Sequence, residues 1–118
     1  MWTILNACPE DLEAILAIEK SSFPDPWTPE MFRSDMALPF SHTWVTKNDA
    51  GRLSGYVCFW LVMDEVHLLD LAVDSPYRRQ GIGETFIRKV IEWSVKKGAN
   101  IVFLEVRESN RAARALYQ

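Results

Sequence analysis

One carboxylate near the end of this chain lies in an apolar stretch, where it could take part in proton transfer. Glu105 interrupts the apolar stretch IVFLEV (101–106), whose other residues are typical of a buried strand. Burial raises the pKa of a carboxyl group, which would make Glu105 a usable general base near neutral pH. The spacing alone also allows a plain strand-end glutamate, paired with Arg107 or with a lysine.

Two further polar residues follow on an expected helix. Asn110 and Tyr117 lie seven residues apart, so a helix would present both on one face. A tyrosine hydroxyl can donate a proton and an amide can hold a ligand. The alternatives are a helix-capping role for Asn110 and a core position for the ring of Tyr117.

The sequence RRQGIG (78–83) indicates an anion-binding turn. It follows the apolar run 66–73 and precedes a helical pattern, and glycines there let backbone N–H groups face a ligand beside the positive end of a helix. A dinucleotide fingerprint would need a third glycine where Phe86 stands, and a Walker loop would need Gly-Lys-Ser/Thr. An ordinary tight turn with solvated arginines is the alternative.

The elements that position these residues alternate in a mixed pattern. Apolar periodicity, caps and turn residues predict the order β-α-α-β-β-β-α-β-α. Leu12, Ile15, Leu16 and Glu19 recur at helical spacing in the first helix. The unit from Val66 to Val106 should be a right-handed parallel crossover. The expected strands are 3–5, 42–46, 53–63, 66–73 and 101–106, and the expected helices are 9–20, 29–36, 82–97 and one from Ser109 onward.

Composition limits the functional class. A chain of 118 residues forms one domain (1–118), and its net charge of −3 argues against nucleic-acid binding. No signal peptide or membrane-spanning run is visible, so a cytoplasmic protein without membrane contact is expected. The two cysteines and two histidines have no metal-ligand spacing, so no metal site is expected. Cys58 lies on an apolar strand and should be inert, and Cys8 is also read as structural.

With these motifs in place, the chain resembles the GNAT superfamily of N-acetyltransferases. RRQGIG fits the family motif Q/R-x-x-G-x-G/A, flanked by LLDLAVDSPY and LEVRESNRAARALY. More closely, the chain is similar to bacterial ribosomal-protein-alanine N-acetyltransferases. The resemblance implies an α/β fold with a mostly antiparallel sheet between helices, and acetyl-CoA as co-substrate. The residues it assigns to acetyl-CoA are Leu71, Ala72, Val73, Arg78, Arg79, Gln80, Gly81, Ile82, Gly83, Glu84 and Asn110.

The resemblance also implies roles in the reaction. Glu105 would take the proton of the incoming amine, and Tyr117 would protonate the departing thiolate. A backbone N–H, expected at Val73, would polarise the thioester. The implied acceptor is a protein N-terminus, most directly the alanine of a small-subunit ribosomal protein. A lysine side chain, a small amine, or a non-catalytic module that binds acyl-CoA are the alternatives.

The chain departs from the family pattern after Gln118, where the family continues with two more strands. Their loss would expose a sheet edge, so we expect a tendency to form homodimers or aggregates through it. Phe23, Trp27 and Trp44 either line the acceptor groove or fill one end of the core.

Overall fold

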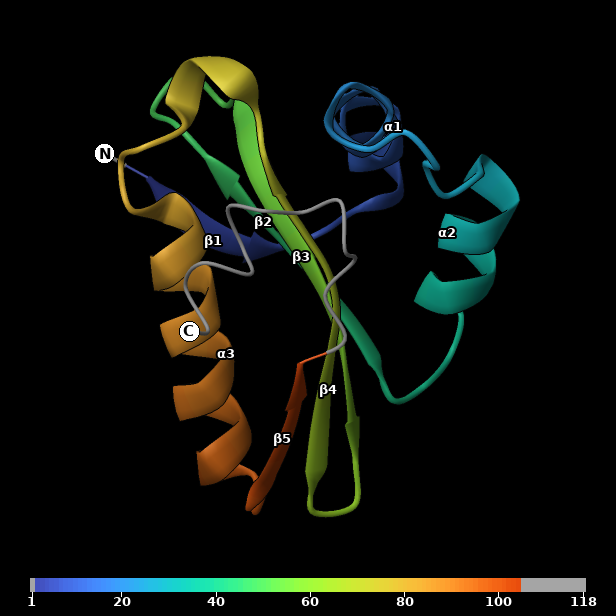
Figure 1. The fold of residues 1–118 in the computed structure, drawn as a ribbon, viewed down its shortest axis with the longest axis vertical. Coiled ribbons are helices and arrows are strands. Elements are labelled where there is room, and N and C mark those ends of the chain that lie inside the picture. Colours follow the sequence, from blue (N-terminus) through green and yellow to red (C-terminus); the bar gives the residue numbers. More distant parts are fainter. Residues whose placement is uncertain (1, 105–118) are drawn as a thin grey trace.

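A computed structural model describes residues 2–104 of the chain (Figure 1). The predicted order of elements is confirmed up to the fifth strand, while the last expected helix lies outside the described residues. The strands are β1 (Thr3–Asn6), β2 (Ser41–Lys47), β3 (Leu53–Val62), β4 (Glu65–Val73) and β5 (Ile101–Leu104). The helices are α1 (Leu12–Ser22), α2 (Pro29–Met36) and α3 (Ile82–Lys96), with short 3-10 turns at Pro9–Asp11 and Ser75–Tyr77.

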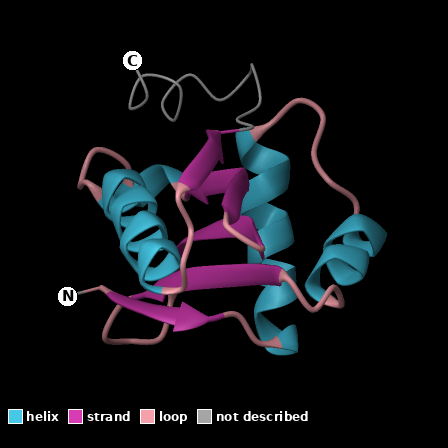
Figure 2. Ribbon diagram, turned by 90° about the horizontal axis from the view of Figure 1, so that it is seen from below, coloured by secondary structure: helices cyan, strands magenta, loops and turns pink. Residues whose placement is uncertain are grey.

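The strands form one sheet in the order β1-β2-β3-β4-β5. The first four strands pair antiparallel, and β5 pairs parallel with β4, as the crossover prediction required. Helices cover both faces: α1 and α2 lie on one, and α3 lies on the other (Figures 1 and 2). The mixed α/β fold predicted from the sequence is confirmed.

Each face of the sheet has its own apolar core. The core on the α3 side is formed by Trp44, Val57, Phe59, Val66, Leu68, Leu71, Ile82, Phe86 and Val90. The core on the α1/α2 side is formed by Ile15, Ile18, Phe23, Phe32, Val45, Leu53, Tyr56, Cys58 and Ala72. Because neighbouring residues of a strand point to opposite faces, the central strands contribute to both cores.

Local signals fix the ends of the helices. Thr28 caps α2, its hydroxyl accepting a hydrogen bond from the N–H of Met31 at 3.2 Å, with Pro29 in the first turn. Gly98, with φ of 103°, follows the end of α3 as predicted. The first helix differs slightly, because Pro9 opens a 3-10 turn and α1 itself begins at Leu12.

A β-bulge in β4 was not foreseen from the sequence. Cys58 pairs with Asp70 and Phe59 pairs with Leu68, so Leu69 is an extra residue on β4. In a regular strand, two residues three positions apart point to opposite faces. Leu68 and Leu71 both lie in the α3-side core, so the bulge reverses the alternation of faces. Leu68 is also the last residue of β4 that pairs with the described part of β5.

Within residues 2–104, no helix is long and apolar enough to cross a bilayer.

Candidate functional site

The connection between β4 and α3 carries the glycine motif. Asp74 caps the 3-10 turn there, its Oδ1 accepting a hydrogen bond from the N–H of Ser75 at 3.0 Å. The backbone is left-handed at Arg79, with φ of 65°, and at Gly81, with φ of 79°. Glycine adopts this conformation without steric cost, whereas Arg79 carries a cost of about 1–2 kcal/mol. Such strained residues concentrate at ligand sites.

The start of α3 offers unpaired backbone donors. Gly81 is the N-cap, and its carbonyl accepts hydrogen bonds from both the N–H and the hydroxyl of Thr85, at 2.9 and 2.8 Å. The N–H groups of Ile82, Gly83 and Glu84 lie in the first turn and therefore have no partner inside the helix. With the positive end of the helix dipole they form a site suited to a phosphate. Glu84 is itself negative, so only its main chain suits such a ligand.

The predicted ligand strand 71–73 uses its side chains for packing. Leu71 lies in the α3-side core with Val73 packed against it, whereas Ala72 lies in the α1/α2-side core. On one edge these residues pair with β3. On the other edge, β5 as far as Leu104 pairs only with Glu65–Leu68 of β4. The part of β4 beyond the bulge therefore has a main-chain edge that the described part of β5 does not cover.

Arg78 connects the motif to the opposite side of the sheet. Its Nε donates a hydrogen bond to the carbonyl of Val73 at 2.9 Å, and its Nη2 donates to the hydroxyl of Ser22 at 3.2 Å. Ser22 is the last residue of α1. The side chain of Arg78 thus holds the end of β4 and the end of α1 together.

The structure brings the residues predicted from 71 to 84 to one end of the sheet, where β4 ends and α3 begins. Glu105, Asn110 and Tyr117 lie outside the described residues. Glu105 directly follows Leu104, which pairs with Leu68 just before the bulge. Glu105, the expected base, is therefore the next residue in sequence after the last described pair between β4 and β5.

A groove of about 600 Å³ lies between α3 and the first two strands. Its aromatic wall is formed by Trp2, Trp44 and Trp93, and it meets the motif at Gln80 and Ile82. Sequence inspection did not identify this groove, because nothing in the spacing links three tryptophans from different elements.

The three aromatic residues considered for an acceptor groove do not lie together. Phe23 belongs to the α1/α2-side core, and Trp27 packs against that core, with its ring 5.1 Å from the ring of Phe32. Trp44 belongs to the α3-side core on the opposite face. Phe23 and Trp44 therefore fit the core alternative, in the cores of opposite faces, and the acceptor-groove alternative stays a prediction.

The thiol of Cys58 lies in the core, as a structural cysteine should. It is fully buried, and burial followed by the charge of Asp70 raises its pKa well above the ordinary value. The hydroxyl of Thr43 donates a hydrogen bond to its Sγ at 3.8 Å. Cys8 is exposed. Among residues 2–104, no group of three or more His, Cys, Asp or Glu side chains is arranged to hold a metal ion.

Comparison with known proteins places this geometry in a family. The sequence profile of the Acetyltransferase (GNAT) family matches residues 12–118. A Bacillus subtilis (strain 168) protein, provisionally named ribosomal protein bS18-alanine N-acetyltransferase, is 39% identical over 110 residues, which are 92% of this chain and 72% of the relative. The Escherichia coli (strain K12) ribosomal protein bS18-alanine N-acetyltransferase is 35% identical over 118 residues, 100% of this chain and 78% of that protein.

A solved structure gives the same result. The crystal structure of the ribosomal-protein-S18-alanine N-acetyltransferase from Escherichia coli superposes with a TM-score of 0.87 and 32% identity. The match covers 99% of this chain and 74% of that one.

Proposed function

Because the chain belongs to the GNAT family of acetyltransferases, we propose that it acetylates the N-terminal α-amine of a protein, using acetyl-CoA. The proposed acceptor is the alanine that begins a small-subunit ribosomal protein. The observation that carries this choice is the similarity, over nearly the whole chain, to two relatives whose names specify that acceptor. The 32% identity to the solved Escherichia coli enzyme supports it further.

The proposed site for acetyl-CoA consists mainly of main-chain groups. The N–H groups at the start of α3 (Gly81, Ile82, Gly83 and Glu84) suit its pyrophosphate, and Arg79 and Gln80 lie exposed in the same turn. The pantetheine arm would lie along residues 71–73 as an added strand, with Asn110 as a further partner. Arg78 fits a supporting role, because its guanidinium already bonds to Val73 and Ser22.

The proposed reaction is a direct transfer. The amine nitrogen forms a bond to the acetyl carbonyl carbon, and the carbon–sulfur bond breaks. Glu105 takes the amine proton, directly or through water, and Tyr117 gives a proton to the thiolate. A backbone N–H at the end of β4 would polarise the carbonyl oxygen. Acetyl-CoA supplies the activated acyl group.

The experiment that tests this function uses two peptides. One begins with a free alanine, and the other has a blocked N-terminus and a free lysine. After incubation with acetyl-CoA, mass spectrometry should show one added acetyl group on the first peptide and none on the second. Acetylation of the lysine alone would overturn the proposed acceptor. No acetylation of either peptide, with acetyl-CoA bound, would favour a non-catalytic module.

The role of Glu105 gives a separate prediction. Glu105→Gln should lower the turnover number by roughly 10²–10⁴-fold, because a general base contributes about that much. Acetyl-CoA affinity, measured by calorimetry, should stay within about twofold, because no phosphate contact is removed. Arg107→Gln is the control for a charge change nearby on the chain, and it should leave turnover close to that of the unmodified protein. Equal turnover in Glu105→Gln would contradict the assignment of the base.

A further inference from the structure

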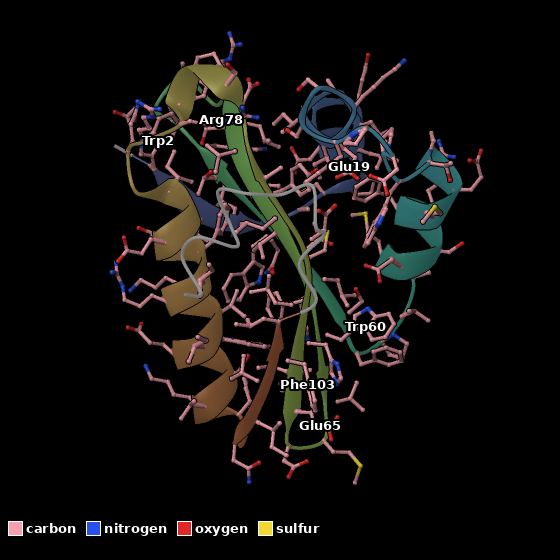
Figure 3. All side chains as sticks on the ribbon, viewed as in Figure 1. Trp2, Glu19, Trp60, Glu65, Arg78 and Phe103 are labelled. Atoms are coloured by element: carbon pink, nitrogen blue, oxygen red, sulfur yellow. The ribbon has the colours of Figure 1, made fainter. Side chains whose placement is uncertain are left out.

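Glu19 is a carboxylate at the centre of the α1/α2-side core. Its exposed fraction is 0%, and it faces the sheet from α1, on the side away from α3 (Figure 3). Transferring a carboxylate from water to such a place costs several kcal/mol unless hydrogen bonds compensate. An apolar residue would complete the helical stripe of Ile15 and Ile18 at no such cost. A charged residue here therefore requires an explanation.

The carboxylate joins three parts of the fold. The hydroxyl of Tyr56 on β3 donates a hydrogen bond to Oε1 of Glu19. The backbone N–H of Trp27 donates to Oε2 at 2.9 Å. Burial, together with the charges of Asp70 and Glu19, raises the pKa of Tyr56 far above its ordinary range, so its hydroxyl remains a donor. Glu19 thus fixes the connection 23–28, between α1 and α2, to the middle of the sheet.

That connection borders the ligand strand. Phe23 and Ala72 belong to the same buried core, and Ser22, just before the connection, is hydrogen-bonded to Arg78 of the motif. The proposed phosphate site lies instead at the start of α3, which covers the opposite face (Figure 2). The connection 23–28 therefore lies against the face of the sheet opposite α3, next to the end of β4.

We propose that Glu19 is a positioning residue for the acceptor: it holds connection 23–28 as a wall of the path by which the peptide amine reaches the thioester. This inference rests on the proposed function. It assigns Glu19 no contact with the reacting atoms. Its effect should fall on the Michaelis constant of the peptide, whereas a residue that only stabilises the fold would affect both substrates together.

The test replaces the carboxylate without emptying the core. In the double variant Glu19→Met/Tyr56→Phe, two apolar groups of similar size take the place of the hydrogen-bonded pair, and Trp27 loses its acceptor. Removing the buried carboxylate together with the Tyr56 hydroxyl leaves no unpaired group between those two, whereas the N–H of Trp27 loses this bond, so a moderate loss of stability is expected. Tyr56→Phe alone is the matched control, because it keeps the bond from Trp27 to Glu19. Glu19→Gln should behave like the unmodified protein, because its amide oxygen can accept the hydrogen bond from Trp27 and its NH₂ can donate one to the Tyr56 hydroxyl.

The measurements are the Michaelis constants for an alanine peptide and for acetyl-CoA, with thermal unfolding as a check on folding. In the double variant, the Michaelis constant for the peptide should rise about tenfold, which is the size of effect expected when one hydrogen bond to a charged acceptor is lost. The Michaelis constant for acetyl-CoA should change less than about twofold. Both single variants should stay within about threefold of the unmodified protein. An unchanged peptide value, or an equal rise for both substrates, would overturn the proposal.

A second measurement needs no variant. In the unmodified protein, hydrogen exchange of segment 23–28 should slow when the peptide is added and stay the same when acetyl-CoA alone is added. Exchange unaffected by the peptide, in a protein that acetylates it, would overturn the role of Glu19 only. A protein that binds acetyl-CoA but acetylates no alanine peptide would overturn the proposed function, and this inference with it.

Discussion

At the scale of single residues, two glutamates interrupt apolar patterns in this sequence. Glu19 stands in the apolar stripe of α1, and the structure shows it fully buried with hydrogen bonds from Tyr56 and Trp27. Glu105 stands in the apolar stretch that includes β5 and lies outside the described residues, so its role as a base stays a prediction. The same sequence signal thus marks one observed buried network and one proposed catalytic group.

His42 gives a prediction about pH. Its ring stacks on Phe59 with centroids 5.2 Å apart and meets the edge of Trp93 at 4.8 Å, and burial lowers its pKa. Above pH about 6.5, His42 is neutral in both the folded and the unfolded chain. As the pH falls below that value, the unfolded chain binds a proton more readily, so the free energy of unfolding should decrease.

The check is urea unfolding at pH 7.5 and at pH 5.5. His42→Phe keeps an aromatic ring and removes the titration, so its free energy of unfolding should decrease less between the two pH values than that of the unmodified protein. Carboxylates are present in both proteins, so the difference between the proteins isolates His42. Parallel decreases would show that His42 does not contribute.

At the scale of elements, β4 is the strand that organises the site. The bulge at Leu69 places Asp70 and Ala72 on the α1/α2 side and Leu71 on the α3 side. The bulge also comes directly after the last pair with the described part of β5, at Leu68. One irregular residue thus separates the part of β4 that pairs with β5 from the part proposed to hold pantetheine.

A substitution at Gly55 on β3 tests whether the end of β4 is part of the ligand site. It pairs with Val73, and a Cβ there would lie 2.9 Å from the carbonyl oxygen of Ala72. That oxygen is main chain, so β4 itself would have to move. Gly55→Ala should lower the free energy of unfolding by about 1–3 kcal/mol and weaken acetyl-CoA binding. Thermal unfolding and calorimetric titration measure the two effects.

The control is Gly51→Ala, at a turn with φ of 82° and nothing within 4 Å of the added Cβ. It should destabilise through backbone strain, by about 1 kcal/mol, and leave acetyl-CoA affinity unchanged. If Gly55→Ala loses stability but binds acetyl-CoA normally, the main chain at the end of β4 is not part of the ligand site.

At the scale of the whole molecule, one sheet separates two cores, and the proposed ligand site lies at one end of that sheet. A ligand that binds only the folded chain raises its stability, by about 2.7 kcal/mol at a concentration of 100 Kd. For a domain of this size, acetyl-CoA at that concentration should raise the Tm by roughly 10 °C. Pantetheine at equal concentration should give a much smaller shift, because it lacks the phosphates that α3 is proposed to bind. Equal shifts from both would contradict the phosphate site.

For residues 2–104, the sequence by itself determined the helices and strands, their order and the location of the glycine motif. These features depend on local physics: apolar periodicity, the caps at Thr28 and Gly98, and the conformational freedom of Gly81. The resemblance to GNAT acetyltransferases followed from the motif and its flanks, and the family match confirmed it.

Only the tertiary structure decided what depends on contacts between distant segments. The bulge at Leu69 depends on the register between β3 and β4, which no local pattern encodes. The separation of Trp44 from Phe23 depends on which face each strand residue takes in the assembled sheet. The link from Glu19 to Tyr56 spans 37 residues of sequence, and only packing of α1 on the sheet brings the two groups together. Burial and hydrogen bonding are properties of that assembly, and the residue types alone left them open.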